Sequence, residues 1–183
     1  MTVRKVNDEV FVASGPIPQI GPADLELLRR QAFANPRRRA RICAHQNNDD
    51  VLHEMVIALA RGCYIHPHRH LGRPESFNII EGAVDVVLFN DAGEISDVIA
   101  MGDQASRLVF YYRLETNVFH GLVMRSDILI FQEVTTGPFR AGGTELADFA
   151  PPESHEVLAA AYARSIQNLT DRYLTVRSAG GAR

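Results

Sequence analysis

Three side chains of the kind that bind metals occur close together near the middle of the chain. Residues 62–82 read GCYIHPHRHLGRPESFNIIEG and contain His68, His70 and Glu75. Because successive side chains of a β-strand point to opposite faces, His68 and His70 would project to the same side of one strand. Two imidazoles and a carboxylate form a donor set that transition metals bind. The spacing therefore predicts a metal site built on a β-strand.

The same segment begins and ends on glycine. Its order is Gly62, five residues, His68, one residue, His70, four residues, Glu75, six residues and Gly82. This order resembles the first motif of the cupin superfamily, G(X)5HXH(X)3-4E(X)6G, at every defined position. The resemblance implies an all-β fold, the double-stranded β-helix or jelly-roll barrel, with the metal inside it.

The second cupin motif, G(X)5PXG(X)2H(X)3N, is present only in part. His120 matches its histidine and follows the first motif by about 50 residues. Glu115 and Asn117 replace the proline and glycine before this histidine, and Met124 replaces the closing asparagine. Asparagine tolerates a positive φ, so Asn117 can still serve the turn. The expected ligand set is His68, His70, Glu75 and His120.

Three neutral imidazoles and one carboxylate suit a divalent Fe, Mn, Ni or Zn ion, with one or two positions left for water or substrate. The alternative is that these histidines are ordinary buried residues of a barrel and that the site is empty. His66 precedes His68 by two residues, so alternation could turn it inward as well. It would then contact substrate or support a ligand, or else lie at the mouth of the barrel without a metal role.

The strands that must position these residues extend from residue 51 to about residue 134. Eight short apolar segments are expected there, at 52–60, 63–68, 77–80, 83–89, 95–101, 108–113, 119–124 and 128–134. The sequence Asn-Asp-Ala-Gly at 90–93 predicts a hairpin turn. Short strands at this regular spacing are typical of a sandwich or a closed barrel.

Helices are expected on both sides of the strand region. Proline is tolerated in the first turn of a helix, so Pro22 can begin one, and Pro36 would end it. A second helix is expected from about Ser154 to Tyr173, with an apolar stripe that packs on the barrel or, alternatively, on a second subunit. We therefore divide the chain into an N-terminal strand and helix extension (1–50), a cupin barrel (51–139), and a C-terminal loop, helix and disordered tail (140–183).

Composition limits the possible classes of protein. The chain has 183 residues and is 46% hydrophobic, which favours one domain with a sizeable core. A net charge of −3 argues against a dedicated nucleic-acid binder, and the arginines at 37–39 and 41 are then a solvated loop. Two cysteines suggest reduced thiols. We found neither a signal peptide nor an apolar run of membrane length, and so expect a cytoplasmic protein.

A closer resemblance extends over about residues 37–153. The run HPHRHLGRPESFNIIEGAVDVVLFNDAGEI resembles the WbuC family of cupin-fold metalloproteins. Arg39, Arg41 and His45, the segment FYYR at 110–113, Glu133 with GPF at 137–139, and APPE at 150–153 are similar to that family as well. The sequence departs from it at Asn78, where a histidine is expected, and at His66, where arginine is usual. The family is associated with bacterial surface-polysaccharide gene clusters, and the resemblance implies the fold and the metal rather than a substrate.

Further residues are candidates for substrate binding and catalysis. Arg39, Arg41 and His45 precede the first barrel strand, where they could hold an anionic substrate such as a carboxylate or a sugar phosphate, or else form surface ion pairs. Tyr111 and Arg113 share one face of a strand. Tyr111 is a candidate proton donor, although a packed ring is the commoner role. Glu133 would either pair with an arginine or act as a base.

These observations support three hypotheses about the function of the protein. The first is an enzyme whose metal acts as a Lewis acid in isomerising or epimerising a sugar, sugar nucleotide or keto acid, or, with Fe(II), as a dioxygenase. The second is a non-catalytic module that binds a small molecule through the metal and the arginines. The third is a barrel that the metal only stabilises. We expect a homodimer with no nucleic-acid or membrane partner.

Overall fold

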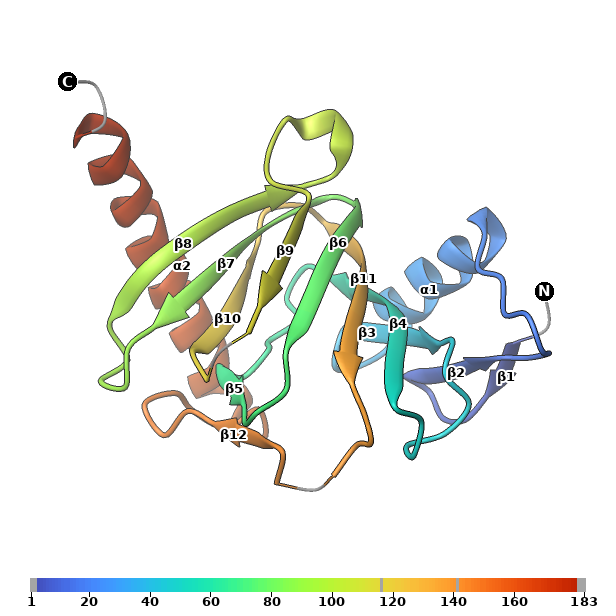
Figure 1. The fold of residues 1–183 in the computed structure, drawn as a ribbon. Coiled ribbons are helices and arrows are strands. Elements are labelled where there is room, and N and C mark those ends of the chain that lie inside the picture. The colour runs from blue at the N-terminus through green and yellow to red at the C-terminus, as the bar shows by residue number, and fades with distance from the viewer. Residues whose placement is uncertain (1–2, 116, 141, 181–183) are drawn as a thin grey trace.

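Two β-sheets carry most of the chain in the computed structural model, which describes residues 3–115, 117–140 and 142–180 (Figure 1). The seven-stranded sheet has the order β1 (Val3–Lys5), β2 (Val10–Ala13), β3 (Arg39–Cys43), β4 (Leu52–Ala60), β11 (Ile128–Thr136), β6 (Glu75–Glu81) and β9 (Tyr111–Leu114). The five-stranded sheet has the order β12 (Thr144–Leu146), β5 (His68–His70), β10 (Phe119–Met124), β7 (Ala83–Phe89) and β8 (Ile95–Gly102). The helices are α1 (Pro22–Ala34), the short 3-10 helix η1 (Gln104–Ser106) and α2 (Glu156–Gly180).

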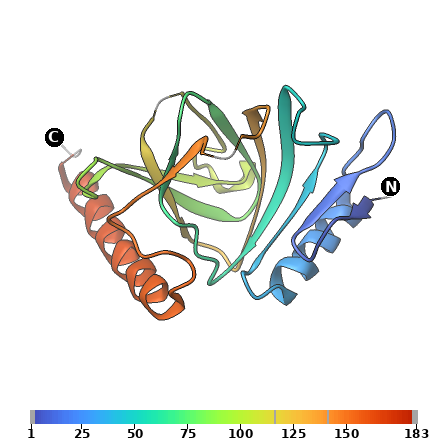
Figure 2. The same ribbon diagram turned by 90° about the horizontal axis from the view of Figure 1, so that it is seen from below.

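The two sheets enclose an apolar core, as expected for a jelly-roll barrel of the cupin type (Figure 2). The core residues from the large sheet are Leu59, Phe77, Ile79, Tyr112, Leu129 and Phe131, and those from the small sheet are Val84 and Val86 of β7 with Met101 of β8. In each strand the core residues recur at every second position, because side chains alternate between the two faces. The barrel predicted from the strand pattern is therefore present.

Strand register decides which side chains of the large sheet point inward. Glu133 of β11 lies opposite Met55 of β4 and Phe77 of β6, and Phe77 lies opposite Tyr112 of β9. Residues that are paired across strands share a face. Since Phe77 belongs to the core, this row places Tyr112 and Glu133 inside the barrel.

Strand β3 was not predicted, because its arginines suggested a solvated loop. Its residues alternate instead. Ala40 and Ile42 are buried against Leu28 and Ala32 of α1. Arg39 and Arg41 occupy the opposite face, which is the face that continues the inner surface of the barrel. The alternation of arginines with buried apolar residues is therefore the pattern of a β-strand with one charged face and one apolar face.

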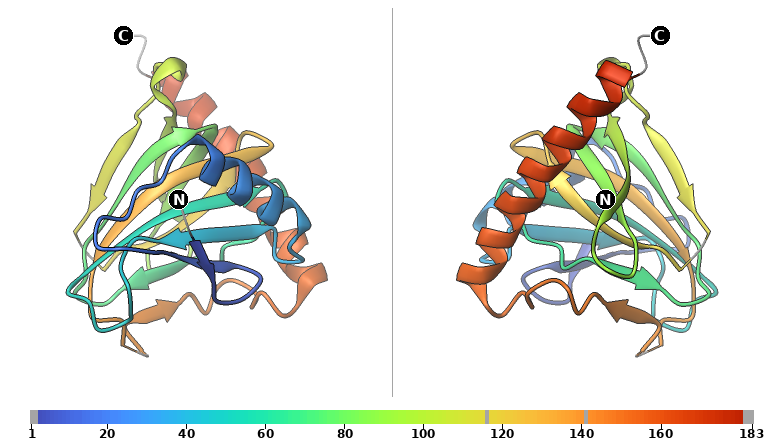
Figure 3. Two further views of the ribbon diagram at one scale, coloured as in Figure 1. Left: turned by 90° about the vertical axis from the view of Figure 1, so that its right-hand side faces the viewer. Right: turned by 90° about the vertical axis from the view of Figure 1, so that its left-hand side faces the viewer.

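Helices α1 and α2 lie on opposite sides of the barrel (Figures 1 and 2). Helix α1 begins at Pro22, where the side chain of Asp24 accepts a hydrogen bond of 2.9 Å from the backbone N–H of Gly21. Helix α2 runs diagonally across the outer face of the five-stranded sheet (Figure 3). Its residues Tyr162, Ile166 and Tyr173 pack there against a cluster that includes Phe89, Val98, Phe119 and Val123.

Among the element boundaries that differ from the predictions, three concern the metal ligands or the end of the chain. Strand β5 contains only the three residues His68–His70, because Pro67 lacks an N–H for the sheet and residues 63–67 are irregular. Strand β6 begins at Glu75, so this carboxylate projects from a strand rather than from a turn. Helix α2 continues over residues 177–180, which we expected to be disordered, whereas residues 181–183 lie outside the described part. No helix among the described residues is both long and apolar enough to cross a membrane.

Candidate metal centre

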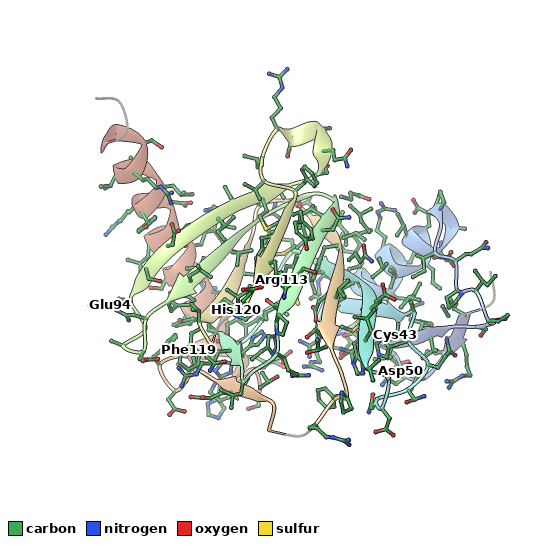
Figure 4. All side chains as sticks on the ribbon, in the orientation of Figure 1. Cys43, Asp50, Glu94, Arg113, Phe119 and His120 are labelled. Carbon is green, nitrogen blue, oxygen red and sulfur yellow. The ribbon has the colours of Figure 1, made fainter. Side chains whose placement is uncertain are left out.

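Three histidines from two neighbouring strands converge inside the barrel. His68 and His70 lie on β5, and His120 of β10 is the register partner of His68. One ligand atom from each of the three rings lies within 4.8 Å of the others. His120 points into the space between the two sheets (Figure 4). The structure thus brings together residues that are about 50 positions apart in the sequence.

Glu75 reaches the same point from the opposite sheet. Its side chain is buried, and its Oε2 atom lies 3.0 Å from Nε2 of His70. Its Oε1 atom lies 3.1 Å from Nε2 of His120. From β6 of the large sheet, Glu75 therefore contacts two of the three histidines of the small sheet.

The Nδ1 atom of each histidine is held by a second group. Nδ1 of His68 lies 2.9 Å from the carbonyl oxygen of His66, and Nδ1 of His120 lies 3.1 Å from that of Val118. Because a carbonyl can only accept, these Nδ1 atoms carry the proton and leave the Nε2 lone pair free. Nδ1 of His70 lies 3.2 Å from the hydroxyl of Thr144. Three oriented rings that offer Nε2 to a common centre are typical of metal-ligating histidines.

The Nε2 atom of His120 lies where a cation would be stabilised. Nε2 of His120 is buried and has no hydrogen-bond partner in the described part of the chain, although it lies 3.1 Å from a Glu75 oxygen. A lone pair on this nitrogen would be repelled by the carboxylate, and the charge of Glu75 therefore raises the pKa of His120, so that a proton or another cation is favoured between the two atoms. A divalent metal between them would remove this repulsion, so the residues present fit a metal of the Fe, Mn, Ni or Zn group.

The charges of the cluster also favour a cation. Burial alone would raise the pKa of Glu75, but His120 and His70 lower it well below its usual range. Burial and the neighbouring His120 lower the pKa of His68 to about 4, so this ring is neutral at neutral pH. Burial would also lower the pKa of His120, but Glu75 raises it overall. The centre therefore combines an ionised carboxylate with a neutral ring at His68 and a position that prefers positive charge at His120.

A cavity of about 320 Å³ opens from the ligands toward strand β3. The His68, His70, Glu75 and His120 side chains form one end, and Arg37, Arg39, Arg41 and Glu133 contribute to the remainder. Apolar side chains complete the wall, among them Ile57, Leu59, Phe77 and Phe131. A small molecule in this cavity would contact the metal ligands and the arginines at once.

Glu133 is a carboxyl group of the cavity wall that forms no hydrogen bond with the histidines among the described residues. Burial, reinforced by the charge of Glu75, raises its pKa to about 8. No ion pair within 4.0 Å involves Glu133 among the described residues, so pairing with an arginine, the role we favoured from sequence, is not observed. A carboxyl group with this pKa can both donate and accept a proton near neutral pH.

Four sequence predictions place residues in the cavity that the structure puts elsewhere. Tyr111 is half exposed and Arg113 pairs with Glu115 at 3.0 Å, because alternation along β9 turns Tyr112 inward instead. His45 stacks on His53 at 4.1 Å between ring centroids, and its Nδ1 lies 3.1 Å from the carbonyl of Glu54. Nε2 of His66 lies 2.9 Å from the carbonyl of Ala147. None of these four lines the cavity.

Sequence reasoning missed Tyr112, Arg37 and Thr144. The Tyr112 hydroxyl donates a hydrogen bond of 2.8 Å to Oε1 of Glu75. The inward position of Tyr112 follows from the alternation of side chains along β9, but the sequence does not show which of the two adjacent tyrosines faces the core. The roles of Arg37 and Thr144 depend on segments far away in the chain and had no local signal.

Comparison with known proteins supports the fold. A family model described as a domain of unknown function, DUF6016, matches residues 20–101. No curated protein matches the chain. Among solved structures, protein SO0799 from Shewanella oneidensis is 16% identical, with a TM-score of 0.51 over 70% of this chain and 84% of that one. This likeness concerns the fold alone.

Two further solved structures resemble parts of the chain less closely. The TT1209 protein from Thermus thermophilus is 24% identical, with a TM-score of 0.44 over 62% of this chain and 93% of that one. KdgF from Halomonas sp. is 20% identical, with a TM-score of 0.40 over 56% of this chain and 80% of that one.

Proposed function

We propose that the protein is a cupin of the WbuC-like type and a metal-dependent enzyme that isomerises or epimerises a small oxygen-rich molecule. The substrate would be a sugar, a sugar nucleotide or a keto acid. The observation that carries this proposal is the shared cavity, which is lined by the His68, His70, Glu75 and His120 cluster, by Arg37, Arg39 and Arg41, and by the carboxyl group of Glu133. The cluster would hold one divalent Fe, Mn, Ni or Zn ion.

The residues of the cavity have separate roles in this proposal. The bound metal would supply Lewis-acid chemistry, which makes the hydrogen next to a carbonyl group more acidic. Glu133 would remove that proton and return it, because it lines the cavity beside the metal ligands and burial raises its pKa. Arg41, which forms no ion pair among the described residues, would bind an anionic group of the substrate. The apolar wall would limit the access of water.

A dioxygenase remains the second candidate if the metal is Fe(II). Glu133 favours the isomerase or epimerase, because moving a proton between two positions of the substrate needs an acid-base group and this carboxyl lines the cavity. Oxygen uptake with the iron-loaded protein separates the two. An isomerase consumes no oxygen with any sugar or keto acid that it converts.

The proposal is tested by proton exchange in heavy water. The protein is loaded in turn with each of the four metals and incubated with a panel of aldoses, ketoses and 2-keto acids in D2O. We expect the carbon-bound proton of a substrate to exchange, as followed by NMR. Glu133→Gln should lose exchange and keep the metal, whereas Glu94→Gln, at an exposed site outside the cavity, should behave as wild type. Tight binding without exchange or turnover would instead identify a binding module.

We also propose that the protein is a cytoplasmic homodimer. Strand β9 is an edge of the large sheet, and the neighbouring Leu108, Val109, Phe110 and Ile80 are 38–47% exposed. Exposed apolar residues at a sheet edge favour pairing with another chain. Both cysteines are free thiols, as in a reducing compartment. Light scattering should give the mass of a dimer for the wild type and of a monomer for Phe110→Asp, and a monomeric wild type would exclude the dimer.

A further inference from the structure

A second, larger cavity lies on the other side of Arg37. This cleft of about 870 Å³ is bounded by residues 61–64, which follow β4, by β10 and by α2, including Tyr64, Met124, Ala160 and Arg164. Arg37 and Leu122 line both the cleft and the metal cavity. Glu153 lines the cleft only. The two spaces are therefore neighbours, and the side chain of Arg37 lies between them.

Arg37 is held by a carboxylate from a distant part of the chain. Its Nε atom donates to Oε1 of Glu153 at 2.8 Å, and its Nη2 atom donates to Oε2 at 2.6 Å. Two parallel bonds of this kind are the geometry in which a guanidinium group binds a carboxylate or a phosphate. Nη2 of Arg39 lies 3.6 Å from the same Oε2 atom. Glu153 thus occupies the position that an anionic group of a ligand would take on these two arginines.

The charges around Arg37 and Arg39 would allow an anionic ligand to bind there. Glu9 pairs with both Arg37 and Arg39 at 3.1 Å, so these two arginines share two carboxylates. Arg41 lines the same cavity and has no ion pair among the described residues. The Arg37–Glu153 pair is also partly exposed, at 46% and 33% of the two side chains. Pairs of this exposure stabilise a protein little, so a competing anion can replace one of the partners.

The Glu153 side chain can move away from Arg37 without moving the backbone that carries it. The carbonyl of Pro151, two residues earlier, accepts a hydrogen bond of 2.9 Å from the hydroxyl of Tyr64, and Ala150 is buried. Helix α2 begins at Glu156. A rotation of the Glu153 side chain alone would release the guanidinium group, since the backbone is held on both sides.

We propose that Glu153 is a displaceable internal ligand, and that the phosphate or carboxylate group of a substrate replaces it on Arg37 and Arg39. This inference rests on the proposed function, because that proposal places the other end of the substrate at the metal ligands. The metal cavity alone is at the lower end of the range of about 300–1,000 Å³ for ligand sites. An anionic group bound on Arg37 in place of Glu153 would lie in the cleft, so the substrate class is an anionic sugar or sugar derivative that extends past Arg37.

Anion binding to matched variants tests the proposal. Inorganic phosphate and acetate are titrated calorimetrically into the wild type, Glu153→Gln and Glu156→Gln, each with and without the bound metal. Glu156 lines the same cleft and lies outside the ion-pair network, so its substitution makes the same change in net charge. We expect Glu153→Gln to bind one of the anions about fivefold more tightly than wild type. Adding Arg37→Ala to Glu153→Gln should abolish the gain.

The possible outcomes separate this proposal from the proposed function. A gain for phosphate identifies a phosphorylated substrate, and a gain for acetate identifies a sugar acid. Equal affinities in wild type and Glu153→Gln, or an equal gain in Glu156→Gln, would overturn the displacement. Metal content is measured on the same samples. A protein that binds no metal but shows the gain would refute the metal-dependent enzyme and leave the anion site standing.

Discussion

The Tyr112 hydroxyl donates a hydrogen bond of 2.8 Å to Oε1 of Glu75, the carboxylate oxygen that also lies 3.1 Å from Nε2 of His120. The tyrosine comes from edge strand β9 and is almost completely buried. The hydrogen bond fixes the orientation of a carboxylate that burial would otherwise destabilise. Outer partners of this kind usually matter for metal affinity nearly as much as the ligands do.

Tyr112→Phe should therefore weaken metal binding while the fold persists. The phenylalanine ring keeps the packing against Phe77, and only the hydroxyl is lost. We expect about tenfold lower affinity for Zn(II), measured by competition with a chelating dye. The adjacent Tyr111→Phe is the matched control, because that side chain is half exposed and lies outside the cavity. Equal losses in both variants would contradict the role of the Tyr112 hydroxyl.

Substitution of His120 tests the ligand set itself. His120→Ala removes the one ring that β10 contributes to the cluster. We expect metal affinity to fall by more than about 100-fold, because losing even an outer partner reduces it about 10–100-fold. Metal content after dialysis measures the effect, with His155→Ala, at an exposed site, as the control. Full metal occupancy in His120→Ala would show that the four-residue assignment is wrong.

The raised pKa of Glu133 makes the stability of the protein depend on pH. Its pKa in the folded protein is about 8, against an ordinary value of 4.5, so between these values the folded state binds the extra proton. Stability should fall as pH rises through this window, with a slope of up to about 1.4 kcal/mol per pH unit from this group. Below pH 4.5 both states are protonated, and the contribution no longer changes.

Urea unfolding of wild type and Glu133→Gln from about pH 5 to about pH 9 measures this slope. Both proteins are used with the metal chelated, so that metal binding does not add its own pH dependence. The glutamine has the shape of the protonated carboxyl and does not titrate. We expect the variant to gain stability relative to wild type as pH rises. Parallel curves for the two proteins would show that Glu133 has an ordinary pKa.

The two glycines that bound the first motif should differ in their tolerance of alanine. Both have a positive φ, 91° at Gly62 and 87° at Gly82. A Cβ atom at Gly62 would meet nothing within 4 Å, whereas at Gly82 it would lie 2.2 Å from the carbonyl oxygen of Ile128. We expect Gly62→Ala to cost about 1–2 kcal/mol from backbone strain, and Gly82→Ala about 3 kcal/mol or more. Thermal unfolding measures both, and similar losses would contradict the steric argument.

Local sequence was sufficient to predict the parts of the centre that depend on strand periodicity. His68 and His70 share a face because they are two residues apart on one strand, and a barrel follows from many short strands at regular spacing. The inward position of Tyr112 was not predictable, since Tyr111 and Tyr112 are the same residue type on opposite faces. Which face is the interior depends on pairing with Phe77 in another strand.

Contacts between distant segments account for the remaining differences. The contact of Arg37 with Glu153 joins residues 116 positions apart, and no local pattern encodes it. The arginines of β3 resembled a solvated run because their charge concealed the buried Ala40 and Ile42 between them. Such a strand becomes recognisable only when α1 is known to cover its other face.

The histidine pair on β5 has a consequence for how the protein is made. This strand has three residues and is paired on one side with β12, whose Thr144 contacts His70, and on the other with β10. Its two neighbours in the sheet are therefore supplied by parts of the chain that the ribosome produces much later. The chain is therefore synthesised with His68 and His70 before His120 and the supporting Thr144 are present. The three-histidine cluster is consequently complete only after β10, about 50 residues later in the chain, has folded against β5.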